Sequence, residues 1–185
     1  MKKTLIALAL TAAICCPAQN LIKNGDFLSV DQTGKLTDWK YNTKEYSLVP
    51  SDRPGETGKK VVKVKLTLPE GKKICRSTMT QMITLRPGKY RLTFTAKVIG
   101  TGFANCDWSC FDKAKKRIKV PQCWTPVCSK PAWKTITHEM VIPEGTDYIR
   151  LSVTGYVNAA YKHKEGTVYF TGISLTPVDA AVEKK

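Results

Sequence analysis

Cysteine and tryptophan side chains are concentrated in one stretch of the sequence. Four cysteines fall within 23 residues with the spacing C-x3-C-x12-C-x4-C, and they are Cys106, Cys110, Cys123 and Cys128. Thiol groups at such a spacing can oxidise to disulfides or, as thiolates, hold a tetrahedral zinc ion. Trp108 and Trp124 lie among the cysteines, and their indole rings are flat apolar surfaces that can stack on a ligand. The stretch is therefore a candidate for both a covalent cross-link and a binding site.

Several pairings of these cysteines are open. If Asp112 to Arg117 forms the tip of a hairpin, residues whose numbers sum to 229 face each other, which places Cys106 opposite Cys123. The competing pairs are local, joining Cys106 to Cys110 and Cys123 to Cys128. An export segment, described below, favours disulfides and makes the zinc site the poorer alternative. Five cysteines follow that segment, so they can form at most two disulfides and one thiol stays unpaired. Whether Cys75 is paired is left open.

Four aromatic residues are the candidates for ligand contact. Sugar rings have flat C–H faces, so carbohydrate sites combine aromatic planes with polar groups that bind hydroxyls. The candidates are Trp108, Trp124, Tyr156 and Tyr161. The alternative for each tryptophan is that it packs on a neighbouring disulfide. The alternative for the tyrosines, which we expect in a loop between the last two strands, is an ordinary exposed loop.

The sequence offers little for catalysis. It has only two histidines, His138 and His163, and it lacks the metalloprotease, serine-hydrolase and phosphate-loop motifs. A cysteine nucleophile needs a lowered pKa and a nearby base, and Cys75 has only basic residues close to it in sequence. We therefore expect no enzyme activity and no cofactor.

The N-terminus has the pattern of a cleaved export signal. Lys2 and Lys3 precede an apolar run from Leu5 to Cys16, and small residues stand three and one places before Gln19, where we expect the mature chain to begin. A lipid-modified Cys15 or Cys16 is the alternative, although the residue before each is not the small one that lipidation prefers. No later stretch reaches the roughly 20 apolar residues of a transmembrane helix. The expected location is outside the cytoplasm: periplasmic, cell-surface or secreted.

The chain is strongly basic. Its formal net charge is +15, and loss of the signal would leave about +13. Such an excess attracts acidic partners over distances that salt shortens. The alternative is a solvated lysine-rich surface with no dedicated anion site. Export and the scatter of the lysines both argue against nucleic acid.

Alternation of apolar and polar residues predicts the elements that hold these side chains. It is clearest in residues 60–68 and 90–98 and repeats in 135–142, 148–154 and 167–175. Glycine- and proline-containing turns separate the runs. The prediction is an all-β fold, an antiparallel jelly-roll β-sandwich, formed by one domain over residues 19–178 and followed by a flexible tail, 179–185.

Several segments resemble one known group of modules. Asn20 to Phe27, followed by Trp39, resembles the opening "N-L-I-x-N-G-D-F … W" of carbohydrate-binding modules of families four and nine, the CenC-like group. Four later segments are similar, in order, to that group's strands and turns: Leu85–Lys97, Phe111–Ile118, Trp133-Lys134 with Val141–Gly145, and Gly166–Leu175. The resemblance implies a galactose-binding-domain-like jelly roll, with Trp39 and Trp133 as core framework residues.

The resemblance also implies a function, with two departures. The implied function is non-catalytic glycan binding, extended by the chain's charge to acidic glycans, and the alternative is a structural or adhesive module that binds protein or cell surface. Where the group often has calcium-binding acids, this chain has Leu28 and Thr171, so no metal is expected and Asp26 is interpreted as a turn residue. The second departure is the cysteine-rich stretch itself. Oligomeric state is not predicted.

Overall fold

The structure is a computed structural model that describes residues 19–42, 46–162 and 164–178. The predicted export signal, 1–18, and the predicted tail, 179–185, lie outside the described residues, as does His163. Within the described ranges, none of the helical segments has the length and apolarity to cross a bilayer.

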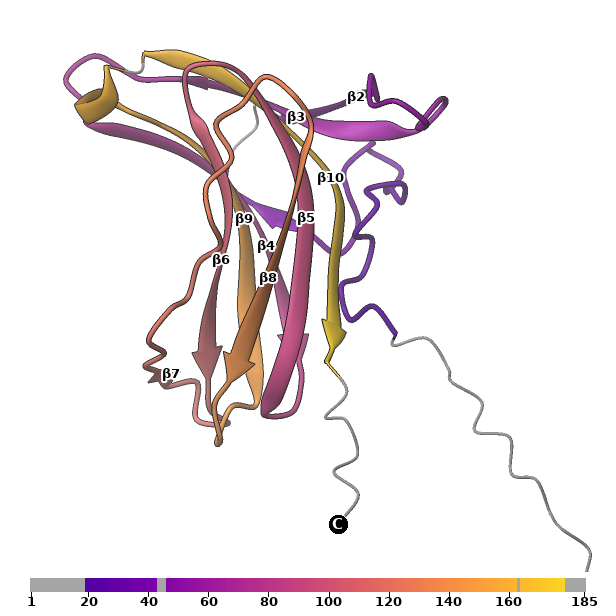
Figure 1. Ribbon diagram of the computed structural model, residues 1–185, viewed down its shortest axis with the longest axis vertical. Helices are drawn as coiled ribbons and strands as arrows, with labels where there is room; N and C mark the ends of the chain where they lie inside the picture. Colours follow the sequence, from indigo (N-terminus) through magenta and orange to yellow (C-terminus); the bar gives the residue numbers. More distant parts are fainter. Residues whose placement is uncertain (1–18, 43–45, 163, 179–185) are drawn as a thin grey trace, which may run out of the picture.

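The described residues form two five-stranded antiparallel sheets. Sheet I has the strand order β1-β4-β9-β6-β7, and sheet II has the order β2-β3-β10-β5-β8. The strands are β1 (Lys40–Tyr41), β2 (Tyr46–Pro50), β3 (Lys60–Thr67), β4 (Ile74–Thr84), β5 (Gly88–Gly100), β6 (Phe103–Phe111), β7 (Arg117–Ile118), β8 (Lys134–Ile142), β9 (Tyr148–Asn158) and β10 (Glu165–Pro177). Non-consecutive strands are neighbours in both sheets, which confirms the predicted jelly-roll β-sandwich (Figure 1).

The core lies between the inner faces of the two sheets. Alternation along each strand sends one set of side chains inward, so that Leu92, Phe94 and Ala96 of β5 meet Ile149, Leu151 and Val153 of β9 in one apolar cluster. The predicted runs at 60–68, 90–98 and 135–142 match β3, β5 and β8 closely. Strand β9 extends four residues beyond the predicted end at Thr154, and this extension matters for the site described below.

The opening motif fastens the N-terminal segment to β10. Asn24 has a positive φ of 48°, and its side chain accepts from Ser29 N (2.9 Å) and donates to Ser29 O (2.7 Å). A Cβ at Gly25 would lie 2.1 Å from the carbonyl oxygen of Ile173, so only glycine fits there. Phe27 is fully buried against Trp39, which confirms Trp39 as a core residue. The amide of Leu28 donates to Asp26 Oδ1 (3.3 Å), the turn role expected for that carboxylate.

Trp133 does not lie in the core, contrary to the prediction. It is half-buried on the outer face of sheet II, where the Lys97 ammonium lies 5.0 Å from its ring centre and 4.7 Å from that of Tyr169. Trp133 Nε1 donates to Asp52 Oδ1 (2.8 Å), and Lys97 pairs with the other oxygen of the same carboxylate. Because Lys97 is buried and charged, the aromatic rings and Asp52 together replace its lost hydration.

Candidate functional site

The outer face of sheet I presents its side chains in five rows of three. Strand β9 lies between β4 and β6, so each outward residue of β9 has a partner on both sides. The rows are Arg76, Tyr156 and Phe103; then Thr78, Thr154 and Asn105; then Thr80, Ser152 and Asp107; then Met82, Arg150 and Ser109; then Thr84, Tyr148 and Phe111. Aromatic rows at both ends thus enclose a polar centre.

The first row is an aromatic and cationic ledge. The rings of Phe103 and Tyr156 are 5.1 Å apart, and the guanidinium of Arg76 lies 5.8 Å from the centre of the Tyr156 ring. Tyr161, in a short 3-10 turn, η1 (Ala159–Tyr161), meets the Phe103 ring edge-on at 5.2 Å. Tyr156 therefore lies within strand β9, not in the loop where the sequence placed it, and Tyr161 extends the same ledge.

Trp124 forms a wall beside the polar centre. The chain after β7 returns alongside β6, and Trp124 pairs with Asp107 across an isolated antiparallel bridge. The amide of Trp108 donates to Cys123 O (2.9 Å) and that of Thr125 to Cys106 O (2.8 Å), which fixes the register. Trp124 is 51% exposed and lines a hollow of about 340 Å³. The other residues of this hollow, the Trp124 end, are Arg76, Thr78, Asn105, Asp107, Cys123, Ser152, Thr154 and Tyr156.

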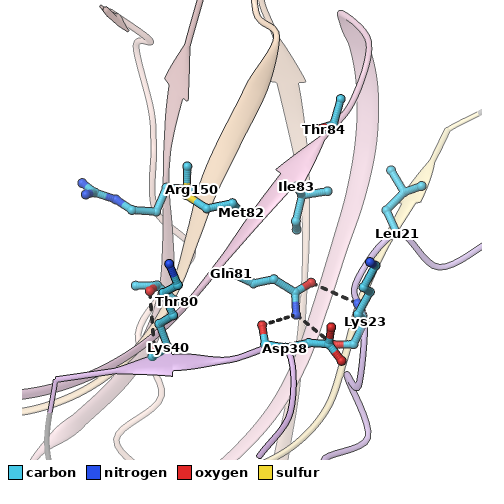
Figure 2. A pocket seen from close by; sticks show the side chains of 10 residues that line it. All are labelled: Leu21, Lys23, Asp38, Lys40, Thr80, Gln81, Met82, Ile83, Thr84 and Arg150. Carbon is cyan, nitrogen blue, oxygen red and sulfur yellow. Dashed lines mark hydrogen bonds between the residues drawn. The ribbon is translucent and has the colours of Figure 1, made fainter. Parts of the chain in front are cut away.

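Two further hollows make the Trp124 end part of a continuous groove. A hollow of about 420 Å³ shares Thr78 and Ser152 with the Trp124 end. It also shares Lys40, Thr80 and Arg150 with a larger hollow of about 710 Å³, the Lys23 end (Figure 2). The eight residue steps from Arg76 to Thr84 along β4 span about 27 Å, at the usual rise of a strand. We call the three connected hollows the sheet groove.

One buried amide holds the Lys23 end together. Gln81 Oε1 accepts from the amide of Lys23 (3.0 Å), and its Nε2 donates to the carbonyls of Lys23 (2.9 Å) and Asp38 (3.1 Å). Figure 2 shows Gln81 reaching from β4 to both segments. The N-terminal segment and the residues before β1 are thereby fixed against the edge of β4, and together they form the walls of this hollow.

The carboxyl group of Asp107 is the electrostatic centre of the Trp124 end. Burial raises its pKa, and hydrogen bonds from Thr154 (3.3 Å) and Ser152, together with the charges of Arg150 and Arg76, partly oppose that rise. Thr154 in turn shares a hydrogen bond with Thr78 (3.3 Å). The result is a carboxylate held in place by two hydroxyl groups, beside an exposed indole.

The raised pKa of Asp107 predicts a pH-dependent gain from its removal. The folded state favours the uncharged form of Asp107. The stabilising contribution of this form is therefore fully present below the ordinary aspartate pKa of about 3.9 and is lost as the pH rises through the pKa of Asp107 in the folded protein. Asp107→Asn should therefore raise the melting temperature at pH 7, and the gain should disappear near pH 3. Thermal unfolding of both proteins at the two pH values measures this. A lower melting temperature for the variant at pH 7 would show that the carboxylate is a structural element.

Trp108 is excluded from the site. Its side chain is 2% exposed and points into the core, where its ring lies 5.5 Å from that of His138. The sequence prediction that Trp108 contacts a ligand is therefore wrong, because β6 alternates and turns Cys106, Trp108 and Cys110 inward while Asn105 and Asp107 face out. Of the four predicted aromatic residues, Trp124 and Tyr156 line the groove and Tyr161 flanks it.

Sequence reasoning missed the polar residues of the groove. Arg76, Asp107 and Thr154 belong to three different strands, and only the strand register brings them together. Alternation along Phe103–Phe111 was the available signal for Asp107, since an inward Trp108 requires an outward Asp107.

The predicted opposition of Cys106 and Cys123 is also wrong. Cys110 pairs with Ile118 at the hairpin tip, and the chain from residue 119 to 122 then gains extra length, so that Cys123 faces Trp108 and Cys106 faces Thr125. In the described part of the chain Cys106, Cys110, Cys123 and Cys128 have free thiols. Burial raises the pKa of the Cys106 and Cys110 thiols, which makes them poor nucleophiles. Among the described residues, no three metal-ligating side chains gather at one point.

Comparison with known proteins identifies the fold. No protein-family model and no curated protein sequence matches this chain. Among solved structures, the chain is similar to TmCBM61 in complex with β-1,4-galactotriose, with a TM-score of 0.55, 16% identity and coverage of 87% of this chain and 100% of that one. A putative sugar-binding protein from Bacteroides thetaiotaomicron has a TM-score of 0.55 and 14% identity, over 86% of this chain and 100% of that one. A family 4 carbohydrate-binding module has a TM-score of 0.52 and 17% identity, over 85% of this chain and 99% of that one. These likenesses confirm the expected jelly-roll fold.

Proposed function

We propose that this protein is a non-catalytic module that binds an extended glycan chain in the sheet groove. The observation that carries the proposal is the exposed Trp124 indole beside the Asp107 carboxylate in the same hollow. An indole face stacks on the C–H face of a pyranose ring, while a carboxylate accepts hydrogen bonds from its hydroxyl groups. The solved structures of like fold, one of them holding a β-1,4-galactotriose, support the same proposal.

The shape of the groove favours a chain over a single sugar. Its three hollows connect along about 27 Å of the sheet. Hydroxyl and amide side chains on its floor, such as Thr78, Asn105 and Ser152, supply donors and acceptors without a large net charge. Such a floor can contact successive sugar residues.

Export and acidic ligands are the finer parts of the proposal. The lysines and apolar run of residues 1–18 support export, which would place the groove among extracellular or periplasmic glycans. The net charge of +15 supports a preference for acidic glycans through long-range attraction. Such attraction is screened beyond about 8 Å at physiological ionic strength, so the preference should weaken as salt rises.

A glycan array with the protein lacking residues 1–18 tests the function. We expect signal on polysaccharide fragments, confirmed by titration calorimetry at low and high salt. Silence on neutral and acidic glycans, together with capture of a defined protein partner, would establish the alternative, a structural or adhesive module. Binding that is unchanged by salt would remove the acidic preference and leave glycan binding intact.

The cysteine-rich stretch should form one disulfide on export, between Cys110 and Cys123. Cys123 faces Trp108 and is thus diagonal to both Cys106 and Cys110. Burial is the main cause of the raised pKa of Cys110 and the charge of Cys123 adds to it, which favours Cys110 as the partner. A disulfide oxidant of the export compartment would accept the two electrons and two protons. A loop of about this length stabilises by about 3 kcal/mol. Peptide mapping without reductant should recover the linked pair, and free thiols at both positions would contradict it.

A further inference from the structure

Charge is segregated along the sheet groove. Of the described residues that line the Lys23 end, three are cations, Lys23, Lys40 and Arg150, and one is an acid, Asp38. The described residues of the Trp124 end include one cation, Arg76, and one acid, Asp107. The groove therefore passes from a locally neutral, aromatic end to a locally positive end within one connected surface.

Among the described residues, the cations of the Lys23 end form no close ion pair, although the charge of Arg150 also acts on Asp107. Within the described ranges, the ion pairs involve other residues, and none includes Lys23, Lys40 or Arg150. The three side chains come from separate segments, the N-terminal segment, β1 and β9, and all three residues are exposed (Figure 2). Three cations that line one hollow from three segments, against a single acid, produce a local positive potential that attracts an anion.

Apolar side chains strengthen this attraction. Leu21, Met82 and Ile83 line the same hollow as the cations. A ligand seated there displaces water from the charges, and charge pairs interact more strongly as the surrounding dielectric constant falls. The pyranose ring that carries an acidic group also presents apolar C–H faces, which Met82, 52% exposed, can contact.

We propose that the Lys23 end binds the carboxylate of a uronic acid residue, while the Trp124 end stacks on a different residue of the same chain. This inference rests on the proposed glycan-binding function and specifies its ligand class: an oligosaccharide with an acidic residue at a fixed separation from the stacked ring. Trp124 pairs with Asp107, which is level with Ser152, so the stacking ring lies only two residues along the sheet from Arg150. The acidic residue should therefore lie close to the stacked residue in the glycan chain. Lys40 and Arg150 are the specificity-determining residues, since they face both the Lys23 end and the centre of the groove.

The test compares each acidic oligosaccharide with its own neutral form. The probes are an oligogalacturonate and a hyaluronan octasaccharide, each before and after reduction of its carboxylates to alcohols, together with a neutral galacto-oligosaccharide. Calorimetry should give at least tenfold tighter binding of one acidic form than of its reduced form. Lys40→Gln/Arg150→Gln should remove that difference, because it weakens binding of the acidic form far more than binding of the reduced form.

The control removes the same charge elsewhere. Lys65→Gln/Lys89→Gln alters two exposed lysines of sheet II and should keep the tenfold preference. Equal binding of acidic and reduced forms, or equal effects of the two double variants, would overturn the inference while leaving glycan binding in place. Failure of the wild-type protein to bind any of the five probes, combined with silence on the glycan array, would overturn the proposed function itself.

Discussion

Replacement of Trp108 by alanine should lower the free energy of unfolding by about 3 to 5 kcal/mol, the usual loss for a large buried aromatic. Its side chain is 2% exposed and packs with Cys106, Cys110 and Ile149 in the core between the two sheets. Because stabilities are commonly about 5 to 15 kcal/mol, this loss is a large fraction of the total. Urea denaturation of the reduced protein measures it without interference from a disulfide.

Trp108→Phe separates packing from hydrogen bonding. Trp108 Nε1 is buried and has no hydrogen-bond partner among the described residues, so the indole N–H contributes a desolvation penalty. Phenylalanine keeps most of the apolar surface and removes that penalty, and its loss should stay below about 1.5 kcal/mol. A Trp108→Ala variant as stable as wild type, with weakened glycan binding, would show instead that the side chain leaves the core to reach the ligand.

Strands whose inward positions are all apolar could be predicted from the sequence. In β5, Tyr90, Leu92 and Phe94 alternate with polar residues, and the predicted range is within a few residues of the observed one. Strand β4 escaped prediction because two of its inward residues, Ser77 and Gln81, are polar. Gln81 is inward because it holds the N-terminal segment, and that long-range role leaves no periodic signal.

The register of the cysteine-rich hairpin could not be predicted for a physical reason. Counting from an assumed tip requires that both strands continue without interruption, but the return chain pairs with β6 only in short pieces. Pro121 and Pro126 lie in this segment and cannot donate the backbone hydrogen bonds of a regular ladder. The extra residues before Cys123 shift every later partner by two or more positions, which separates Cys106 from Cys123.

The candidate site was predictable in its aromatic part only. Tryptophan and tyrosine are the residue types most typical of carbohydrate sites, and residue type alone was enough to propose Trp124 and Tyr156 from the sequence. Threonine and serine on a strand are ordinary surface residues, so Thr154 and Ser152 carry no signal until their neighbours are known. For Asp107, the only sequence signal was its position between Cys106 and Trp108, two residues that face the core.

Trp124→Ala should weaken glycan binding about thirtyfold, equivalent to about 2 kcal/mol, while leaving the melting temperature unchanged. The indole is 51% exposed, so its loss removes little buried surface from the fold, whereas it removes the main stacking surface of the Trp124 end. Calorimetry with the tightest array ligand and thermal unfolding of the same samples provide the two measurements. Trp133→Ala is the matched control, since Trp133 lies on the outer face of sheet II and is engaged with Lys97.

Trp124→Ala and Trp133→Ala should have opposite effects on the two measurements, affinity and melting temperature. Trp133→Ala removes a partner of the buried Lys97 ammonium, so it should lower the melting temperature and leave the affinity unchanged. Loss of affinity with Trp133→Ala but not with Trp124→Ala would move the binding site to sheet II. Because Trp124 stands opposite Asp107 on the neighbouring strand, Trp124→Phe should restore part of the affinity, as the smaller ring keeps a stacking face over the same carboxylate. A Phe variant as weak as the Ala variant would show that Trp124 acts through its indole N–H and not through stacking.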